Sequence, residues 1–330
     1  MGAEWYSLEA QKIMLLSRAL APNTVTTYRT GINHYLRFCS QVLADPLPLT
    51  ENIIENFCVS LYSRVSYKAI KVYLCGVQFW SKLHGCPVLI KSMPRLEYVT
   101  KAIRRAQGGR FTRPLRPPIT WPMLRRICAF IAQSESPHDS DMLIAAVLLA
   151  YFGLLRVSEY TSPSSVSFDE SSHLAVSDVN VQWGRRVALV TIKMSKTDPF
   201  REGVTVRVGV LSHYLCPVHA LVRYLIRRGS SPGPLFLFRN GAYLTRAHVL
   251  DLLVRSLPDI PNVNTHSFRR GGASALAAAN TPSHVIQILG RWRSNAYAQY
   301  IQLDDDFLIQ ANRDMARGRQ SDDSGPSSSG

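Results

Sequence analysis

The segment from Lys101 to Arg126 divides this chain into two parts, because it interrupts any continuous run of helix or strand. It holds eight Lys or Arg residues and no Asp or Glu, and its turn-forming residues are Gly108, Gly109, Pro114, Pro117 and Pro118. Glycine and proline break regular structure, so the segment predicts a linker between domains. With 330 residues, the chain is long enough for two domains that each bury a core.

The part before the linker has the spacing of short amphipathic helices. Asn23 and Thr24 are residue types that cap helix N-termini. After them, apolar residues at helical spacing predict one buried stripe: Val25, Tyr28, Ile32, Tyr35, Leu36 and Cys39. Further helices are expected at 50–63, 67–83 and 94–107. We therefore predict a compact helical domain over residues 7–107 and a basic linker over 108–118.

The part after Thr120 mixes helical and strand patterns. Strands are expected at 174–179, 186–192 and 204–208. Helices are expected at 121–133, 140–155, 217–228, 244–256, 267–279, 283–289 and 294–301. The predicted fold class is mainly α with a small antiparallel sheet: a helical N-terminal domain, then a mixed α/β domain over 119–312. The tail 313–330 is rich in Ser, Gly and Asp and is expected to be disordered.

The charge of the chain favours a polyanionic partner. Lys and Arg total 38 against 23 Asp and Glu, which gives a net charge of +15 and a pI near 9.8. Nucleic acid is the leading candidate. The six cysteines are scattered, as in a reducing compartment. No signal peptide is expected, and the longest apolar run, 142–155, is too short to span a bilayer.

One group of residues has the spacing of a metal site. His213, Cys216 and His219 follow one another at intervals of three. Pro217 suits the first turn of a helix, so Cys216 lies at its cap and the three side chains need not converge. We therefore predict that these residues hold no metal ion.

The sequence T-H-S-F-R-R-G-G-A-S, residues 265–274, indicates phosphoryl transfer. His266 and Arg269 are one helical turn apart and can face the same group. Tyr300 follows Arg269 by 31 residues. An enzyme that attacks a phosphodiester with a phenol must neutralise the charge on the non-bridging oxygens, which guanidinium and imidazole groups can do. Arg156, Glu159 and Lys196 lie upstream in Y-F-G-L-L-R-V-S-E-Y and T-I-K-M-S-K-T-D.

Taken in chain order, these residues resemble the catalytic set of tyrosine recombinases, the phage-integrase family: Arg156, Lys196, His266, Arg269, Trp292 and Tyr300. S-K-T-D, H-S-F-R-R-G-G-A-S and G-R-W-x-S-x-A-x-x-x-Y are most similar to the recombinases of eukaryotic DIRS-type and related mobile elements. The resemblance spans roughly residues 119–305 and continues more weakly toward the N-terminus.

The resemblance implies a core-binding domain followed by a catalytic domain. It implies double-stranded DNA as the partner of a homo-oligomer, a dimer on one site and a tetramer in synapsis. It implies no metal or nucleotide, no membrane, and, because the similar elements are eukaryotic, a nuclear location.

The resemblance also assigns the nucleophile and the phosphate ligands. Tyr300 would attack phosphorus and form a 3′-phosphotyrosine bond. Tyr297 is its rival, but the family's spacing favours Tyr300, which comes nine residues after Arg291, whereas Tyr297 comes six after it. Arg156 and Arg269 would bind the non-bridging oxygens, because a planar bidentate donor matches phosphate.

Three further roles carry an alternative. Lys196, on a predicted hairpin loop, would protonate the departing 5′ oxygen, with Lys193 as its rival. His266 would shuttle the phenol proton or donate to an oxygen, unless it only caps the next helix. Glu159 would orient the two arginines, unless it forms an ordinary helical ion pair.

One departure from the family pattern concerns L-G-H, which here reads L-G-R-W. Trp292 is our choice for the phosphate donor because its indole N–H can only donate, and Arg291 is second, with a supporting role. Contacts to the DNA backbone are expected from basic residues of the linker and the His-x-x-Arg motif: Lys101, Arg104, Arg105, Arg110, Arg113, Arg116 and Arg270.

The function expected from this set is site-specific cleavage and rejoining of DNA strands in the integration or recombination of a mobile element. Two alternatives stay open. The first is a host-adopted DNA-binding protein that has this fold but does not cleave. The second is a type IB topoisomerase, which shares the chemistry but would relax DNA as a monomer.

Overall fold

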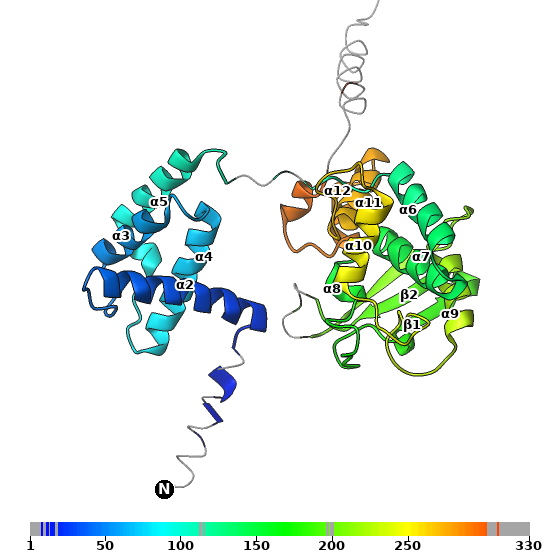
Figure 1. The fold of residues 1–330 in the computed structure, drawn as a ribbon, viewed down its shortest axis with the longest axis horizontal. Helices are drawn as coiled ribbons and strands as arrows, with labels where there is room; N and C mark the ends of the chain where they lie inside the picture. The colour runs from blue at the N-terminus through cyan, green and yellow to red at the C-terminus, as the bar shows by residue number, and fades with distance from the viewer. Residues whose placement is uncertain are drawn as a thin grey trace, which may run out of the picture. The chain divides into compact units, whose positions relative to one another are not determined.

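The computed structural model describes residues 8, 11–12, 14–16, 19–111, 114, 116–195, 198, 201–301 and 309. Lys196, Arg113 and the tail 313–330, all subjects of predictions above, lie outside the described residues. The chain divides into two compact units, Met1–Arg113 and Pro114–Gly330, called here the N-terminal and C-terminal units (Figure 1). The chain is mainly helical with one small antiparallel sheet, which confirms the predicted fold class.

The N-terminal unit is a set of helices around one apolar core. Its elements are α2 (Pro22–Gln41), α3 (Glu51–Leu61), α4 (Tyr67–Leu83), the 3-10 turn η1 (Ile90–Ser92) and α5 (Pro94–Gln107). The predicted ranges of α4 and α5 are confirmed, and that of α3 is shorter by a residue or two at each end. Side chains such as Tyr35, Ile54, Phe57 and Ile70 are fully buried between the helices.

Two glycines let α2 and α4 approach closely. A Cβ on Gly31 would lie 2.6 Å from the Cα of Tyr73, and one on Gly76 would lie 2.9 Å from the carbonyl oxygen of Tyr28. Both distances are shorter than real side chains allow, so the helices pack backbone against backbone at these positions.

Two details of the prediction for α2 are wrong. Asn23 and Thr24 do not cap the helix, because it already begins at Pro22, whose fixed φ suits the first turn. Leu36 is 36% exposed and does not belong to the buried stripe. Tyr35 and Cys39 of the same stripe are buried in the core, where the Tyr35 ring packs against Phe57 of α3 and Trp80 of α4.

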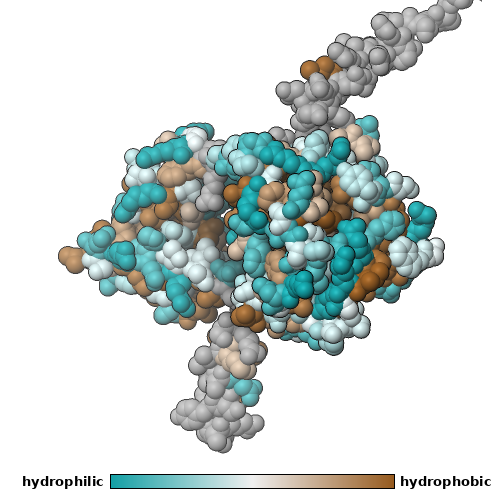
Figure 2. Space-filling view, turned by 45° about the vertical axis from the view of Figure 1, so that its right-hand side comes forward, coloured by the Kyte–Doolittle hydropathy of each residue, from teal (hydrophilic) through white to brown (hydrophobic). Residues whose placement is uncertain are grey.

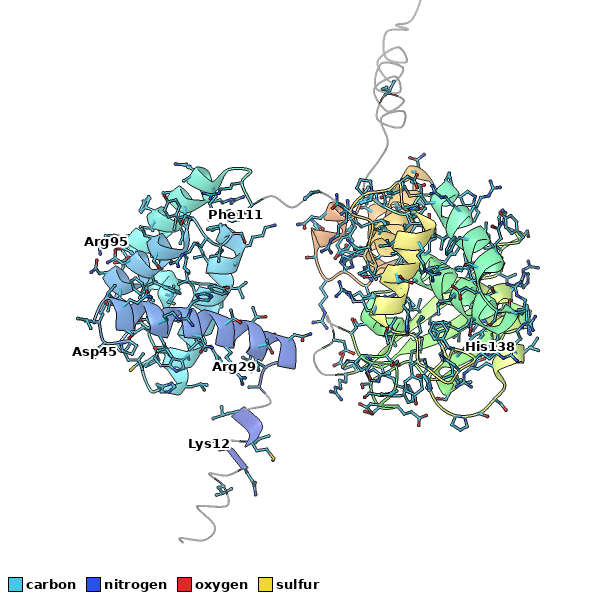
Figure 3. All side chains as sticks on the ribbon, viewed as in Figure 1. Lys12, Arg29, Asp45, Arg95, Phe111 and His138 are labelled. Carbon is cyan, nitrogen blue, oxygen red and sulfur yellow. The ribbon has the colours of Figure 1, made fainter. Side chains whose placement is uncertain are left out.

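The end of α5 is tied to the loop before α4 by a buried glutamine. Gln107 donates to the carbonyl oxygens of Tyr62 and Val65 and accepts from the backbone N–H of Tyr67. At the other end of α5, Arg95 is exposed and pairs with Glu55 of α3 at 3.0 Å (Figure 3). These contacts hold α5 against α3.

The C-terminal unit begins with a buried helix hairpin and continues into the sheet. Its elements are α6 (Trp121–Ser134), α7 (Pro137–Phe152), α8 (Val157–Tyr160), η2 (Val176–Asp178), β1 (Val179–Gln182), η3 (Trp183–Arg185), β2 (Val187–Ile192), β3 (Val204–Gly209), α9 (Pro217–Arg228), α10 (Arg246–Ser256), α11 (Ser267–Ala278), α12 (Ser283–Leu289) and η4 (Asn295–Gln299).

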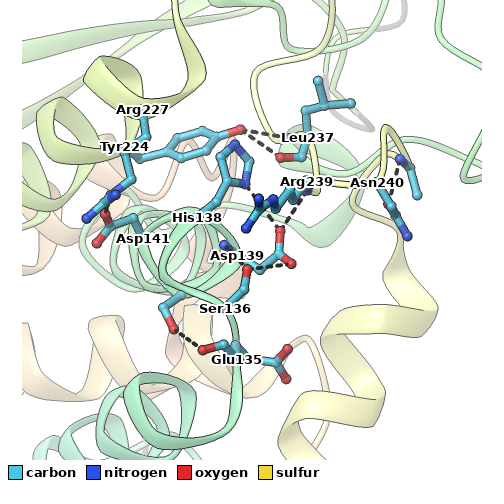
Figure 4. A network of polar contacts seen from close by, with 12 residues as sticks. Glu135, Ser136, His138, Asp139, Asp141, Tyr224, Arg227, Leu237, Arg239 and Asn240 are labelled. Atoms are coloured by element: carbon cyan, nitrogen blue, oxygen red, sulfur yellow. Dashed lines mark hydrogen bonds and ion pairs between the residues drawn. The ribbon is translucent and has the colours of Figure 1, made fainter.

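Helix α7 is the centre of this unit. It is buried over most of its length, as predicted, and packs against α9, α6 and α11. The carboxylate of Asp141 on α7 accepts from Arg223 and Arg227 of α9, which neutralises a charge that is nearly buried. Figure 4 shows this ion pair beside Tyr224, whose hydroxyl donates to the carbonyl oxygen of Leu237.

The sheet has the strand order β1-β2-β3, with both pairs antiparallel. The predicted strand 174–179 is wrong, because Val179 only begins β1. Leu174 instead accepts from the backbone N–H of Leu235, far along the chain. The carboxylate of Asp178 then accepts from the N–H of Ala175 and turns the chain through η2 before the strand starts.

The last helices carry the residues of most interest. Helices α11 and α12 match their predicted ranges within a residue. The helix expected at 294–301 is wrong in type and length, because Asn295–Gln299 is a 3-10 turn.

Figure 2 shows hydrophilic side chains over much of the visible face of the C-terminal unit. Among the described residues, no helix is long and apolar enough to cross a membrane.

The start of α11 packs directly on the backbone that leads into α6. A Cβ on Gly271 would lie 2.0 Å from the carbonyl oxygen of Ile119. The backbone N–H of Ile119 donates to the carbonyl oxygen of Ser267. We predict that Gly271→Ala lowers the free energy of unfolding by about 1–3 kcal/mol, since the overlap outweighs the roughly 1 kcal/mol by which alanine favours helix. Urea unfolding of the full chain measures this change.

Gly184→Ala is the matched control, because nothing lies within 4 Å of a Cβ at that position. Equal stability of the Gly271 and Gly184 variants would contradict the close packing of Ile119 on α11.

Candidate active site

The turn between α7 and α8 positions Arg156 through a buried carboxylate. Arg156 precedes the first residue of α8, and Glu159 lies on its first turn. One oxygen of Glu159 accepts from the backbone N–H of Arg156 at 2.9 Å, and the other accepts from its guanidinium at 2.8 Å. The same guanidinium nitrogen donates to the hydroxyl of Ser195 at 3.1 Å. No motif in the sequence pointed to this role of Ser195.

Arg291 binds the same carboxylate from the C-terminal side. Its Nη2 donates to Glu159 at 2.8 Å and to the carbonyl of Leu154 at 3.1 Å, and its Nη1 donates to the carbonyl of Gly153 at 3.1 Å. Glu159 was expected to orient Arg156 and Arg269. Glu159 forms ion pairs with Arg156 and with Arg291, and not with Arg269. The expected contact with Arg269 is therefore wrong.

The two arginines decide the charge of Glu159. Its side chain has no exposed surface, and burial by itself raises the pKa of a carboxyl group. The charges of Arg291 and Arg156, with the backbone hydrogen bond from Arg156, outweigh that effect and hold the pKa of Glu159 below its ordinary value. Glu159 is therefore an ionised carboxylate that ties the segment after α12 to the turn before α8.

Arg269 lies beneath Trp292 on the first turn of α11. Its guanidinium donates to the carbonyls of Leu154 and Gly290 and stacks against the Trp292 ring at 4.4 Å. Burial first, and then the charges of Arg156 and Arg291, lower its pKa to about 9. Arg269 has no exposed surface, so its contact with a phosphate stays a prediction that requires Trp292 to shift.

Gly290 makes the position of Trp292 possible. A Cβ on Gly290 would lie 1.6 Å from the Trp292 ring. The ring also lies 5.1 Å from that of Tyr300, and its buried Nε1 has no hydrogen-bond partner among the residues that the structure describes. The glycine of L-G-R-W was therefore a sequence signal for this packing, although its meaning depends on the folded geometry.

His266 and Tyr300 come together across 34 residues of sequence. The Tyr300 hydroxyl oxygen lies 3.3 Å from Nε2 of His266, and it donates when that nitrogen carries no proton. His266 is the N-cap residue of α11, but among the described residues its side chain makes no capping hydrogen bond, so the alternative of a satisfied capping side chain is wrong. The rival Tyr297 packs on Trp292 at 6.3 Å between ring centres.

Four arginines act on His266. Burial first, followed by the charges of Arg116, Arg269, Arg156 and Arg270, lowers the pKa of His266 to about 4. The imidazole is therefore neutral at physiological pH and able to accept a proton. Arg270 also donates to the carbonyl of Gln299 at 2.7 Å, which holds η4 against α11.

The other predicted DNA-binding residues lie along the surface. Lys101, Arg104, Arg105, Arg110 and Arg116 are exposed, and the first of them pairs with Glu97. Lys196 and Arg113 lie outside the described residues, so neither has a structural account. Lys193, the rival of Lys196, pairs with Asp178 at 2.9 Å and donates to the carbonyl of Glu170.

Two of the residues with the spacing of a metal site, His213 and Cys216, make packing contacts and a hydrogen bond. Among the residues described, no cluster of three or more His, Cys, Asp or Glu side chains could hold a metal ion. His213 packs between Trp121 and Tyr214, and Cys216 accepts from the backbone N–H of Leu211.

The fold matches that of solved tyrosine recombinases and integrases. A XerH site-specific recombinase bound to its palindromic difH substrate, in a post-cleavage complex, aligns with 87% of this chain and 78% of its own, at a TM-score of 0.60 and 15% identity. The Tn1549 transposon integrase in complex with transposon right-end DNA aligns with 94% of this chain and 98% of its own, at a TM-score of 0.55 and 15% identity. A lambda integrase dimer bound to a COC′ core site aligns with 89% of this chain and 76% of its own, at a TM-score of 0.54 and 14% identity.

At such low identity these likenesses show the fold alone, which is that of tyrosine recombinases. No family model and no curated protein sequence matches the chain.

The buried carboxylate yields a stability prediction. Glu159→Gln leaves Arg156 and Arg291 without their counter-charge, and should lower the free energy of unfolding at pH 7 by about 3–5 kcal/mol. The pKa of Glu159 is lowered in the folded state, so its contribution is present above the ordinary value of 4.5 and is lost as the pH falls through the folded pKa. Urea unfolding should therefore show the difference from wild type narrowing below pH 4.5.

Asp251→Asn provides the control, because Asp251 is largely exposed and pairs with Arg255 on one helix face. Such a pair contributes at most about 1 kcal/mol. A Glu159→Gln variant with an equally small, pH-independent effect would contradict the bridging role.

Proposed function

We propose that this protein cleaves and rejoins DNA strands through a covalent bond between Tyr300 and a 3′ phosphate. One observation carries the proposal: the Tyr300 hydroxyl lies 3.3 Å from a neutral His266, in a group of arginines, within the fold of tyrosine recombinases. A phenol beside a proton acceptor and several guanidinium groups is suited to attack a phosphodiester. The excess of basic residues, +15 in net charge, supports DNA as the substrate.

The reaction exchanges one phosphoester bond for another. The Tyr300 oxygen attacks phosphorus while its proton passes to Nε2 of His266. The bond from phosphorus to the 5′ oxygen breaks, and that oxygen leaves as a hydroxyl after it takes a proton from a general acid, which we assign to Lys196. The reverse sequence rejoins the strand. Because the ester bond energy is kept in phosphotyrosine, the cycle needs no nucleotide or metal cofactor.

The phosphate ligands are Arg156, Arg269 and Trp292. Arg156 is only partly buried and is already oriented by Glu159. Among the described residues, the buried Nε1 of Trp292 has no partner, whereas Arg291 lacks one at Nε but has its Nη1 and Nη2 groups held by Glu159 and by backbone carbonyls. This difference supports Trp292 as the phosphate donor and Arg291 as a positioning residue.

The wider setting is also part of the proposal. We assign the activity to site-specific recombination or integration of a mobile element, of the eukaryotic DIRS-related type that the motifs resemble, with action in the nucleus. The partner is double-stranded DNA, bound by a dimer on each site and a tetramer in synapsis. The lambda integrase neighbour is a dimer bound to a core site, which supports a homo-oligomer.

A second candidate is a DNA-binding protein that has this fold but does not cleave. The complete burial of Arg269 beneath Trp292 favours it, since a catalytic arginine must reach the phosphate. A type IB topoisomerase is the third, and relaxation of supercoiled DNA by a monomer would distinguish it. A nicked suicide duplex separates cleavage from binding alone, because only a cleaving enzyme forms a protein–DNA adduct that resists SDS.

Tyr300→Phe should abolish this adduct and leave the Kd for duplex DNA nearly unchanged, because the variant loses only the nucleophilic oxygen. Gel analysis of the suicide duplex measures the adduct, and fluorescence anisotropy measures the Kd. Tyr297→Phe is the matched control and should form the adduct. The reverse pattern would move the nucleophile to Tyr297.

Lys196→Ala should slow cleavage by roughly 10²- to 10⁴-fold, as expected for a lost general acid. A substrate with sulfur in place of the bridging 5′ oxygen should recover most of this loss, because a thiolate leaves without protonation. The single-turnover rates on both substrates give the result. Lys193→Ala serves as the control and should show no selective recovery. A defect of Lys196→Ala that persists on the sulfur substrate would exclude Lys196 as the proton donor.

A further inference from the structure

The residues just before α6 form a short stiff arm, Arg116–Pro117–Pro118–Ile119, called here the proline arm. Proline fixes φ near −65°, and a residue that precedes proline is restricted to extended conformations. Both restrictions act within the arm and favour an extended backbone from Arg116 to Pro118. Pro117 and Pro118 are half-buried, while Arg116 is exposed.

The proline arm is anchored on the helix that follows His266. Ile119 is fully buried, and its N–H donates to the carbonyl of Ser267 at 2.9 Å. The carbonyl oxygen of Ile119 packs against Gly271 and occupies the space that a Cβ at that position would need. An ideal extended proline segment rises about 3.1 Å per residue, so Arg116, three residues before the anchor, would lie within about 9 Å of it.

We infer that Arg116 binds the DNA phosphate that lies against the His266–Tyr300 pair. The inference rests on the proposed function and adds a cation from the linker to its site. Arg116 belongs to the C-terminal unit. Arg104 and Arg105 lie on α5 and Arg110 follows it, all in the N-terminal unit. Those residues retain the general role of backbone contact.

The electrostatics of the site agree with this placement. The groups that act on His266 are Arg116 from the proline arm, Arg269 and Arg270 from α11, and Arg156 from the turn before α8, and Tyr300 lies against its ring. After burial, the charge of Arg116 is the first of these in lowering the pKa of His266, and it also lowers that of Arg270. Guanidinium groups bind phosphate oxygens through charged hydrogen bonds, and the anchor at Ser267 brings the proline arm beside His266.

The experiment compares Arg116→Ala with Arg207→Ala, which removes an exposed arginine of β3 in the same unit. At saturating suicide duplex, Arg116→Ala should form the adduct roughly 10-fold more slowly, less than the ~10²- to 10³-fold loss of a buried oxyanion donor. It should also move the acid limb of the pH–rate profile to higher pH, because its loss raises the pKa of His266. Arg116→Lys should restore most of the rate, and Arg207→Ala should change neither quantity.

Histidine NMR titration of the same variants without DNA provides an independent measurement. The pKa of His266 should rise in Arg116→Ala and stay unchanged in Arg207→Ala. If Arg116→Ala matches the wild type in adduct rate and in the pKa of His266, the inference is overturned. A wild-type protein that forms no adduct overturns the proposed function instead, and the titration then still decides whether Arg116 lies at His266.

Discussion

The ion pairs of Glu159 hold the candidate site together. Its carboxylate has no exposed surface and joins two segments that are far apart in sequence, the turn that carries Arg156 and the stretch that follows α12. A buried carboxylate between two guanidinium groups is tolerated only while both remain in place, because either partner alone leaves a charge uncompensated. The segment that ends in Tyr300 is therefore held at the arginine cluster by charge as well as by apolar packing.

Apolar packing completes this arrangement around Trp292. Leu154, Ala273, Ile286 and Trp292 form a small buried cluster of their own, and Tyr300 packs against it. The ring of Trp292 stacks on the buried Arg269, so one proposed phosphate ligand is covered by another. Access to Arg269 and the position of Tyr300 are thus linked through one side chain.

Much of the fold follows from local sequence signals. Helix α9 could be placed because Pro217 fits its first turn and Gly229 follows its last residue. The strand expected at 174–179 failed because its partner is not local: Leu174 binds the backbone of Leu235, and periodicity within a short window does not encode such a pairing. In the same way, η4 is held by Arg270 and α12 rather than by its own helical pattern.

The site divides along the same line. His266, Arg269 and Tyr300 could be selected from the chemistry of phosphate and from motif spacing, and the structure brings them together. The pairing of Arg291 with Glu159 could not be foreseen, because L-G-R-W does not say which way either side chain turns. That direction depends on Gly290 and on carbonyls at the end of α7, which only the folded chain brings within reach.

The charge of the site has a consequence for when His266 can act. Burial, followed by the charges of Arg116, Arg269, Arg156 and Arg270, holds the pKa of His266 at about 4, which makes the imidazole a weak base. A phosphate among these arginines would offset their charge, and a nearby anion raises the pKa of an imidazole. In the proposed reaction, the bound phosphate would therefore strengthen His266 as the base for Tyr300, so that the phenol is activated when there is a phosphorus atom for it to attack.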